Sequence, residues 1–156
     1  MSDSAPPERV DAGDYVIAYT LEITAPPERI WAVVADPHRH HEFDGSGTVR
    51  DRAKGPHDLS EGDTFSVHMR KFGIPYRLPL QVTRAEQLRV LEWAQPTGHR
   101  WRWELDYNGT STRVTEAYDA SRQNPAVRAL LDRARVPQQN AASIRASLQR
   151  LKHLME

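Results

Sequence analysis

The sequence contains no cysteine, and this removes a whole group of chemistries. Disulfide bonds, thiolate metal sites and cysteine nucleophiles all need a thiol, so none of them is open to this chain. The charge is also unbiased, because 21 Lys and Arg are matched by 21 Asp and Glu. Without a basic excess, the sequence gives no electrostatic reason to expect nucleic acid or an anionic membrane as a partner.

Long hydrophobic runs are absent as well. No apolar stretch approaches the roughly 20 residues of a membrane-spanning helix, so we expect no membrane span. The polar start "MSDSAPPERVDAGD" lacks the apolar segment of a signal peptide, and we therefore expect a cytoplasmic protein. A length of 156 residues suits one domain. We predict a flexible tail over residues 1–14 and a single domain over residues 15–156, as a monomer or weak homodimer.

What the sequence does contain is alternation. The segment "HRWRWELDY" (residues 99–107) places bulky side chains at every second position and charged ones between them. This pattern is typical of a β-strand with one covered face and one wet face. Similar alternation predicts further strands over residues 15–24, 64–70, 74–83, 89–94 and 112–120. Asn108-Gly109 is a strong signal for a tight hairpin turn.

Helical patterns flank these strands. "APPERIWAVVAD" (residues 25–36) predicts a short helix, and "HRHHEF" (residues 38–43) a possible second helical turn. After Asn124-Pro125 the spacing becomes helical, and a final stripe suits one long amphipathic helix: Ile144, Leu148, Leu151 and Met155. The order predicts an α+β fold, in which a curved antiparallel sheet of about seven strands wraps around the C-terminal helix.

The segments "ITAPPERIWAVVADPHRHHEFDGSG", "IPYRLPLQVT" and "HRWRWELDYNGTSTRVTEAYDAS" resemble the START-like helix-grip superfamily. This superfamily includes polyketide cyclases and dehydrases, lipid-transfer domains and plant hormone-binding proteins. The resemblance covers nearly the whole chain and is greatest to small bacterial members. It implies a ligand cavity between the sheet and the C-terminal helix, which agrees with the order of elements. It does not imply one reaction, because the fold hosts carriers, receptors and enzymes alike.

We expect the inward-facing side chains to line this cavity rather than fill a dry core. Four Trp and five Tyr include several whose polar ends need partners when buried. The candidate ligand-binding residues are Tyr19, Phe65, Val67, Met69, Tyr76, Leu78, Trp93, Trp101, Trp103, Tyr107, Tyr118, Ile144 and Leu148.

Glu116 and His99 are the candidate catalytic residues. Alternation places Glu116 on the same face as Val114 and Tyr118, where an unpaired carboxylate is costly and its pKa rises. Such a group can act as an acid, as a base or as a hydrogen-bond anchor for a ligand. The alternative is a carboxylate paired with an Arg at the end of the sheet, or one that reaches solvent at the rim.

Two turns are candidate gates to the cavity. In plant abscisic-acid receptors of this fold, similar loops close over the ligand. The resemblance assigns Gly73, Ile74 and Pro75 to a gate, and His99 and Arg100 to a latch. The simpler interpretation is that both segments are ordinary hairpin turns.

We predict no metal site and no cofactor. His38 and His41 stand one helical turn apart, but zinc needs three or four ligands and no further spacing supports one. A phosphate loop and a serine nucleophile elbow are also absent. The leading hypothesis is binding of a small hydrophobic molecule, either aromatic, polyketide-like or lipid-like. The alternatives are a cyclase, aromatase or dehydratase that uses the same cavity, and a protein-interaction module.

Overall fold

One antiparallel sheet of eight strands carries the fold, in the order β1-β2-β8-β7-β6-β5-β4-β3. The computed structural model describes residues 5–156. Its elements are β1 (Glu8–Val10), β2 (Val16–Ile23), α1 (Pro27–Val34), the 3₁₀ helix η1 (Pro37–Glu42), β3 (Val49–Lys54), β4 (Thr64–Lys71), β5 (Ile74–Glu86), β6 (Val90–Ala94), β7 (Arg100–Tyr107), β8 (Thr112–Asp119), α2 (Pro125–Arg133) and α3 (Val136–Met155).

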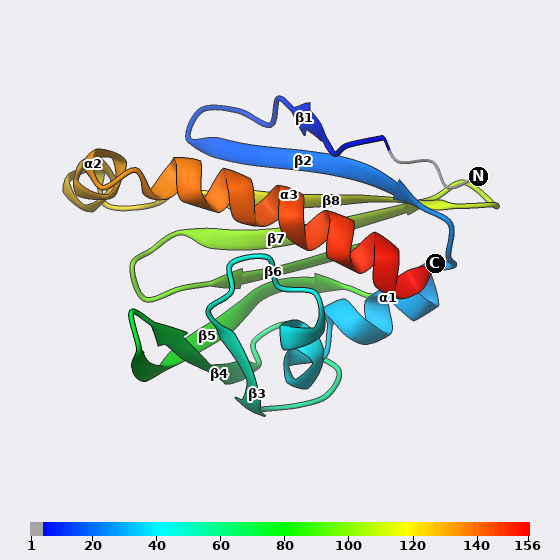
Figure 1. Cartoon of the computed structure of the whole chain (residues 1–156), viewed down its shortest axis with the longest axis horizontal. Coiled ribbons are helices and arrows are strands. Elements are labelled where there is room, and N and C mark those ends of the chain that lie inside the picture. Colours follow the sequence, from blue (N-terminus) through cyan, green and yellow to red (C-terminus); the bar gives the residue numbers. More distant parts are fainter. Residues whose placement is uncertain (1–4) are drawn as a thin grey trace.

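The predicted helix-grip architecture is confirmed. The sheet curves beneath α3, which lies across it and ends beside α1 (Figure 1). The sheet has eight strands instead of about seven: besides the six segments listed from alternation it contains β3 and the short β1, which Glu8–Val10 form along β2. The flexible tail expected over residues 1–14 is therefore wrong for this segment, while residues 1–4 lie outside the described part.

The apolar stripe of α3 forms the centre of the core. Ile144, Leu148 and Leu151 have no exposed surface and belong to one cluster with Val114 and Trp103 of the sheet. The helix contacts β2 and β8 more than any other strands. Burying side chains of this size stabilises the fold by roughly 1.5–3 kcal/mol each.

The opposite face of the sheet carries an ion-pair network. Glu92 accepts hydrogen bonds from Arg100 and Arg102, each at 3.1 Å, and Arg102 also reaches Asp119 at 3.4 Å. Burial alone raises the pKa of Glu92, but the hydrogen bonds from Thr83 and the two arginines lower it overall. The two arginines of "HRWRWELDY" thus have specific partners: Glu92 of β6 for both, and Asp119 of β8 for Arg102.

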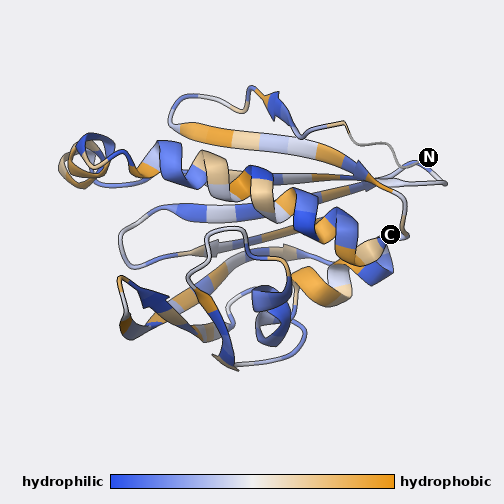
Figure 2. Cartoon of the chain, viewed as in Figure 1, coloured by the Kyte–Doolittle hydropathy of each residue, from blue (hydrophilic) through white to orange (hydrophobic). Residues whose placement is uncertain are grey.

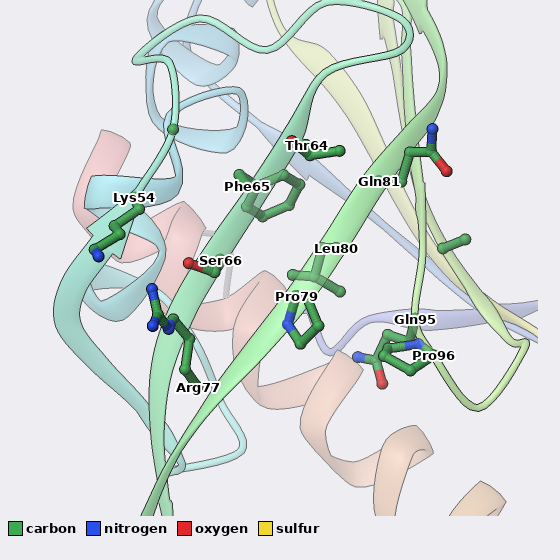
Figure 3. Close-up of a pocket in the computed structure, with 12 residues that line it drawn as sticks. Lys54, Thr64, Phe65, Ser66, Arg77, Pro79, Leu80, Gln81, Gln95 and Pro96 are labelled. Carbon is green, nitrogen blue, oxygen red and sulfur yellow. The ribbon is translucent and has the colours of Figure 1, made fainter.

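The first part of β5 is paired on one side only. Residues 74–81 all pair with β4, whereas pairing with β6 begins at Gln81. Pro75 and Pro79 both lie in this half-paired segment. A groove of about 680 Å³ follows the gap on the outer face, where Ser66, Arg77 and Pro79 line it (Figure 3).

The hairpin between β4 and β5 turns through two residues. Lys71 pairs with Ile74, so that Phe72 and Gly73 form the turn, with φ values of 52° and 75°. Glycine adopts such left-handed angles readily. A large aromatic side chain does not, and it costs about 1–2 kcal/mol there.

Candidate functional site

A cavity of about 480 Å³ lies between the concave face of the sheet, η1 and the first half of α3. Its volume is within the usual range for small-molecule sites. Nine of the predicted site residues line it: Val67, Met69, Tyr76, Leu78, Trp93, His99, Trp101, Trp103 and Glu116. Eight of them come from the five consecutive strands β4 to β8 and His99 from the β6–β7 loop, and the curved sheet brings them together.

Six predicted ligand-binding residues do not line this cavity. Ile144, Leu148 and Tyr118 are buried in the packed core. Tyr19 is buried too, and its hydroxyl accepts a hydrogen bond of 2.8 Å from Arg145. Phe65 lines the outer groove instead (Figure 3).

Tyr107 shows most clearly why the alternation misled. Its side chain is 48% exposed, and its hydroxyl donates to the carbonyl of Gly109 at 2.8 Å. The alternation of β7 continues to this residue, but the strand has by then passed the edge of the core. Its neighbour on the same face, Leu105, is still buried.

The two walls of the cavity differ in chemistry. The sheet contributes three indole rings, Trp93, Trp101 and Trp103, together with aliphatic side chains. Opposite them, α3 contributes polar side chains: Gln139, Asn140, Ser143 and Ser147. The apolar stripe of α3 faces the core beside the cavity, so the sequence prediction of an apolar helix wall is wrong. The site therefore has an aromatic side and a hydrogen-bonding side.

Glu116 is a buried carboxyl without a partner. The residue is 7% exposed, and its Oε1 atom has no hydrogen bond within the described residues. Burial raises its pKa well above the ordinary value of 4.5, and the charge of Asp44 adds to the rise. Among residues 5–156 no arginine pairs with it, which removes the first of the two structural explanations considered for this residue. The environment favours the protonated carboxyl, which can donate a hydrogen bond into the cavity.

His99 is a buried neutral imidazole at the end of the β6–β7 loop. Burial lowers its pKa to about 4. Its Nδ1 lies 2.8 Å from the Thr97 hydroxyl, and its ring packs against Tyr118 with centroids 4.9 Å apart. Gln123 donates to the Thr97 carbonyl at 2.8 Å and so fixes this loop. The arrangement holds one histidine, uncharged at neutral pH, in the cavity wall.

His40 is a cavity residue that the sequence analysis missed. Its Nε2 donates to the carbonyl of Val34 at 2.8 Å, and its ring stacks on Trp93 with centroids 5.2 Å apart. Burial lowers its pKa, so the ring is neutral and Nδ1 is left as an acceptor. Three histidines stand close together in "HRHHEF", and only the path of η1 decides which one turns inward.

The loop after η1 packs tightly on α3. The backbone N–H of Gly45 donates to the Ser147 hydroxyl at 2.8 Å. A Cβ at position 45 would lie 2.6 Å from the backbone nitrogen of Ser147 and from the Cβ of Ala146. This close approach seats Asp44 at the cavity, next to the polar face of α3.

The residues assigned to gates are placed unequally. Gly73, Ile74 and Pro75 are exposed in the β4–β5 hairpin and do not line the cavity, although Lys71 and Tyr76 beside them do. Of the latch pair, His99 faces the cavity, whereas Arg100 lies on the opposite face with Glu92. Gating by these segments stays a prediction.

A group of metal-binding residue types lies outside the cavity. One donor atom each from Asp36, His38 and His57 lie within 4.8 Å of one another. His57 Nδ1 is 3.0 Å from Asp36 Oδ2, and His38 Nε2 is 3.0 Å from the Gly55 carbonyl. These contacts fasten the β3–β4 loop to η1. His41, which we had paired with His38 in sequence, is exposed and is not one of the three.

Comparison with known proteins agrees with this geometry. The model of the family described as polyketide cyclase / dehydrase and lipid transport matches residues 16–156. The uncharacterized protein Rv0088 of Mycobacterium tuberculosis is 48% identical over 111 residues, which are 70% of this chain and 50% of that protein. The chain thus spans about half the length of this relative.

Solved structures share the fold at low sequence identity. A Rhodobacter sphaeroides protein superposes with a TM-score of 0.71 at 15% identity, over 95% of this chain and 96% of its own. Protein CV1439 of Chromobacterium violaceum gives a TM-score of 0.69 at 16% identity, over 92% and 99%. In the described part of the chain, none of the helices is both long and apolar enough to cross a membrane.

Proposed function

Because the chain belongs to the polyketide cyclase/dehydrase and lipid transport family, we propose that it binds a small planar molecule in the cavity under α3. The observation that carries this proposal is the unpartnered Glu116 carboxyl in a wall of tryptophans. A buried polar group without a partner is costly, and a ligand oxygen that accepts its hydrogen bond removes that cost.

The two walls define the ligand further. Three indole faces suit a flat, largely apolar body, since aromatic rings stack favourably on one another. The amides and hydroxyls of Gln139, Asn140 and Ser143 suit oxygens along one edge of that body. An acyl chain uses only the first wall and leaves the second unsatisfied. The chemistry favours a hydroxylated or keto-bearing aromatic molecule over a simple fatty acid.

A cyclase or dehydratase activity is the second candidate, and one observation favours it. Glu116 in its protonated form and the neutral His99 line the same cavity. A neutral imidazole can remove a proton next to a ketone, while a carboxylic acid donates a proton to the oxygen that gains charge. The interaction-module alternative requires a filled core, and the cavity does not support it.

Quenching of tryptophan fluorescence tests the binding proposal. We would titrate the protein with a hydroxylated anthraquinone and, separately, with a saturated fatty acid. We expect the anthraquinone to bind more tightly and Ser143→Trp, which fills the polar side of the cavity, to abolish binding. Tyr107→Ala lies outside the cavity and is the matched control. Equal binding by wild type and Ser143→Trp, or preference for the fatty acid, would contradict the proposal.

Glu116→Gln separates the carrier from the enzyme. The amide keeps the size and a hydrogen-bond donor but cannot transfer a proton. A carrier keeps its affinity for the anthraquinone within a few-fold in this variant. If the protein is an enzyme, the variant still binds but no longer converts a linear poly-β-ketone to a cyclic product. Mass spectrometry detects that conversion in wild type as the loss of water from the substrate.

A further inference from the structure

The tip of the β4–β5 hairpin exposes apolar side chains at an unfavourable backbone position. Phe72 is 91% exposed and Ile74 is 65% exposed. The positive φ of Phe72 disfavours a large side chain, and its ring has only the Lys71 ammonium, 5.7 Å from its centroid, as a described ring contact. Nothing inside the molecule is gained by placing this residue there, and strain of this kind points to an external role.

The surroundings of the tip are basic. Residues 70–77 include Arg70, Lys71 and Arg77 and contain no acidic residue, although the whole chain has a net charge of zero. The overall balance therefore hides a local excess of positive charge. Figure 2 shows the hydrophobic colour of this turn beside the hydrophilic colour at the end of β4.

The hairpin stands at the mouth of the cavity. Lys71 and Tyr76 of the hairpin line the cavity, as does Val136 at the start of α3. In Figure 1 the hairpin and α2 lie at the same end of the molecule, away from the C-terminus. α2 adds an exposed Leu130 (66%) and, just beyond its end, an exposed Arg135.

We propose that the Phe72–Ile74 tip inserts into the surface of an anionic lipid bilayer, with the cations beside it on the lipid phosphates. A narrow apolar tip projecting between cations suits a soft interface into which it can penetrate. Protein interfaces are usually broader and more complementary in shape. Docking in this position turns the cavity mouth toward the membrane, from which an apolar ligand can enter. The inference rests on the hairpin and holds whether or not the proposed cavity ligand is correct.

Vesicle flotation tests the proposal without any cavity ligand. The full chain is mixed with vesicles of phosphatidylglycerol and phosphatidylcholine in equal parts, and separately with phosphatidylcholine alone. We expect binding to the anionic vesicles only. Removing one cation near an anionic surface lowers the partition coefficient by about fivefold. We therefore expect a decrease of this size for Lys71→Gln and for Arg70→Gln. Raising the salt concentration weakens binding further.

Phe72→Asn is the decisive variant. Asparagine accepts the left-handed backbone well, so the fold is retained or stabilised while the ring is removed. We expect its partition coefficient to fall by about tenfold. Leu154→Asn, on an exposed part of α3, is the matched control and leaves binding unchanged. Absence of wild-type binding to anionic vesicles, or equal binding by Phe72→Asn, overturns the proposal. The proposal is also overturned if Phe72→Asn differs from wild type in oligomeric state while neither protein binds vesicles. The tip is then a contact between copies of the chain.

Discussion

The buried carboxyl of Glu116 gives the folded protein a specific dependence on pH. The pKa of this group is raised well above 4.5 in the folded state, chiefly by burial. Between 4.5 and the raised value, the folded state holds a proton that the unfolded state has lost. The contribution of Glu116 to stability is therefore full below pH 4.5 and decreases as pH rises. The slope is about 1.4 kcal/mol per pH unit.

Glu116→Gln isolates this contribution. Glutamine has nearly the same shape and stays neutral, so it keeps the stability that the wild type loses with rising pH. We expect the free energy of unfolding of the variant, minus that of wild type, to increase between pH 5 and pH 7, with a slope of at most about 1.4 kcal/mol per pH unit. Urea unfolding at several pH values, followed by tryptophan fluorescence, measures this difference.

The comparison between variants matters because other groups titrate in the same range. His40 and His99 remain in both proteins, and their contributions cancel in the difference. Glu61→Gln, at an exposed position, is the control for loss of a carboxylate as such. A difference between Glu116→Gln and wild type that stays constant from pH 5 to pH 7 would refute the inferred burial of an unpaired carboxyl.

Three further predictions concern the cavity wall, the loop after η1 and the ion pairs on the opposite face of the sheet. The folded-state pKa of His99 is about 4, below the ordinary 6.5, so wild type loses about 3 kcal/mol of stability as pH falls from 6.5 to 4. His99→Gln should remove this loss, and urea unfolding at pH 4 and pH 7 checks it. Gly45→Ala should cost about 1–3 kcal/mol because its Cβ would lie 2.6 Å from α3, and an unchanged urea midpoint contradicts that close approach. Arg102→Met should lower the free energy of unfolding by about 3 kcal/mol, because it removes a partner from the partly buried carboxylates of Glu92 and Asp119. Arg84→Met, in an exposed ion pair, should cost less than about 1 kcal/mol, and equal shifts in melting temperature for the two variants would argue against the network.

The sheet was predictable because its side chains alternate strictly. Trp103, Leu105 and Val114 are buried where the pattern places them, and the helical spacing of Ile144, Leu148 and Leu151 correctly identifies the core stripe of α3. Alternation also placed Glu116 on the inner face. A period of two or 3.6 reports which side of an element is covered, and that information is local.

The composition of the cavity wall was not predictable in the same way. Gln139, Ser143 and Ser147 follow one another at intervals of four residues, so they form a second stripe beside the apolar one. Which stripe faces a cavity depends on how far α3 is rotated over β2 and β8. The inward turn of His40 likewise depends on how the 3₁₀ helix η1 is seated, and its ring packs against Phe65 and Trp93, which lie far along the chain. Such placements follow from packing and not from periodicity.

The two prolines in the half-paired part of β5 affect how the molecule meets other chains. A strand edge with free N–H and C=O groups is a template on which another strand can pair. Backbone groups alternate in direction along a strand, so the N–H positions of residues 75, 77 and 79 point to the same side of β5. Two of these three residues are Pro75 and Pro79, which have no N–H. On the open side of this segment Arg77 is left as the lone backbone donor among the three. The two prolines therefore hinder another chain from pairing with this strand edge and aggregating there. The gap between β5 and β6 stays open beside the cavity, where small molecules can still reach it.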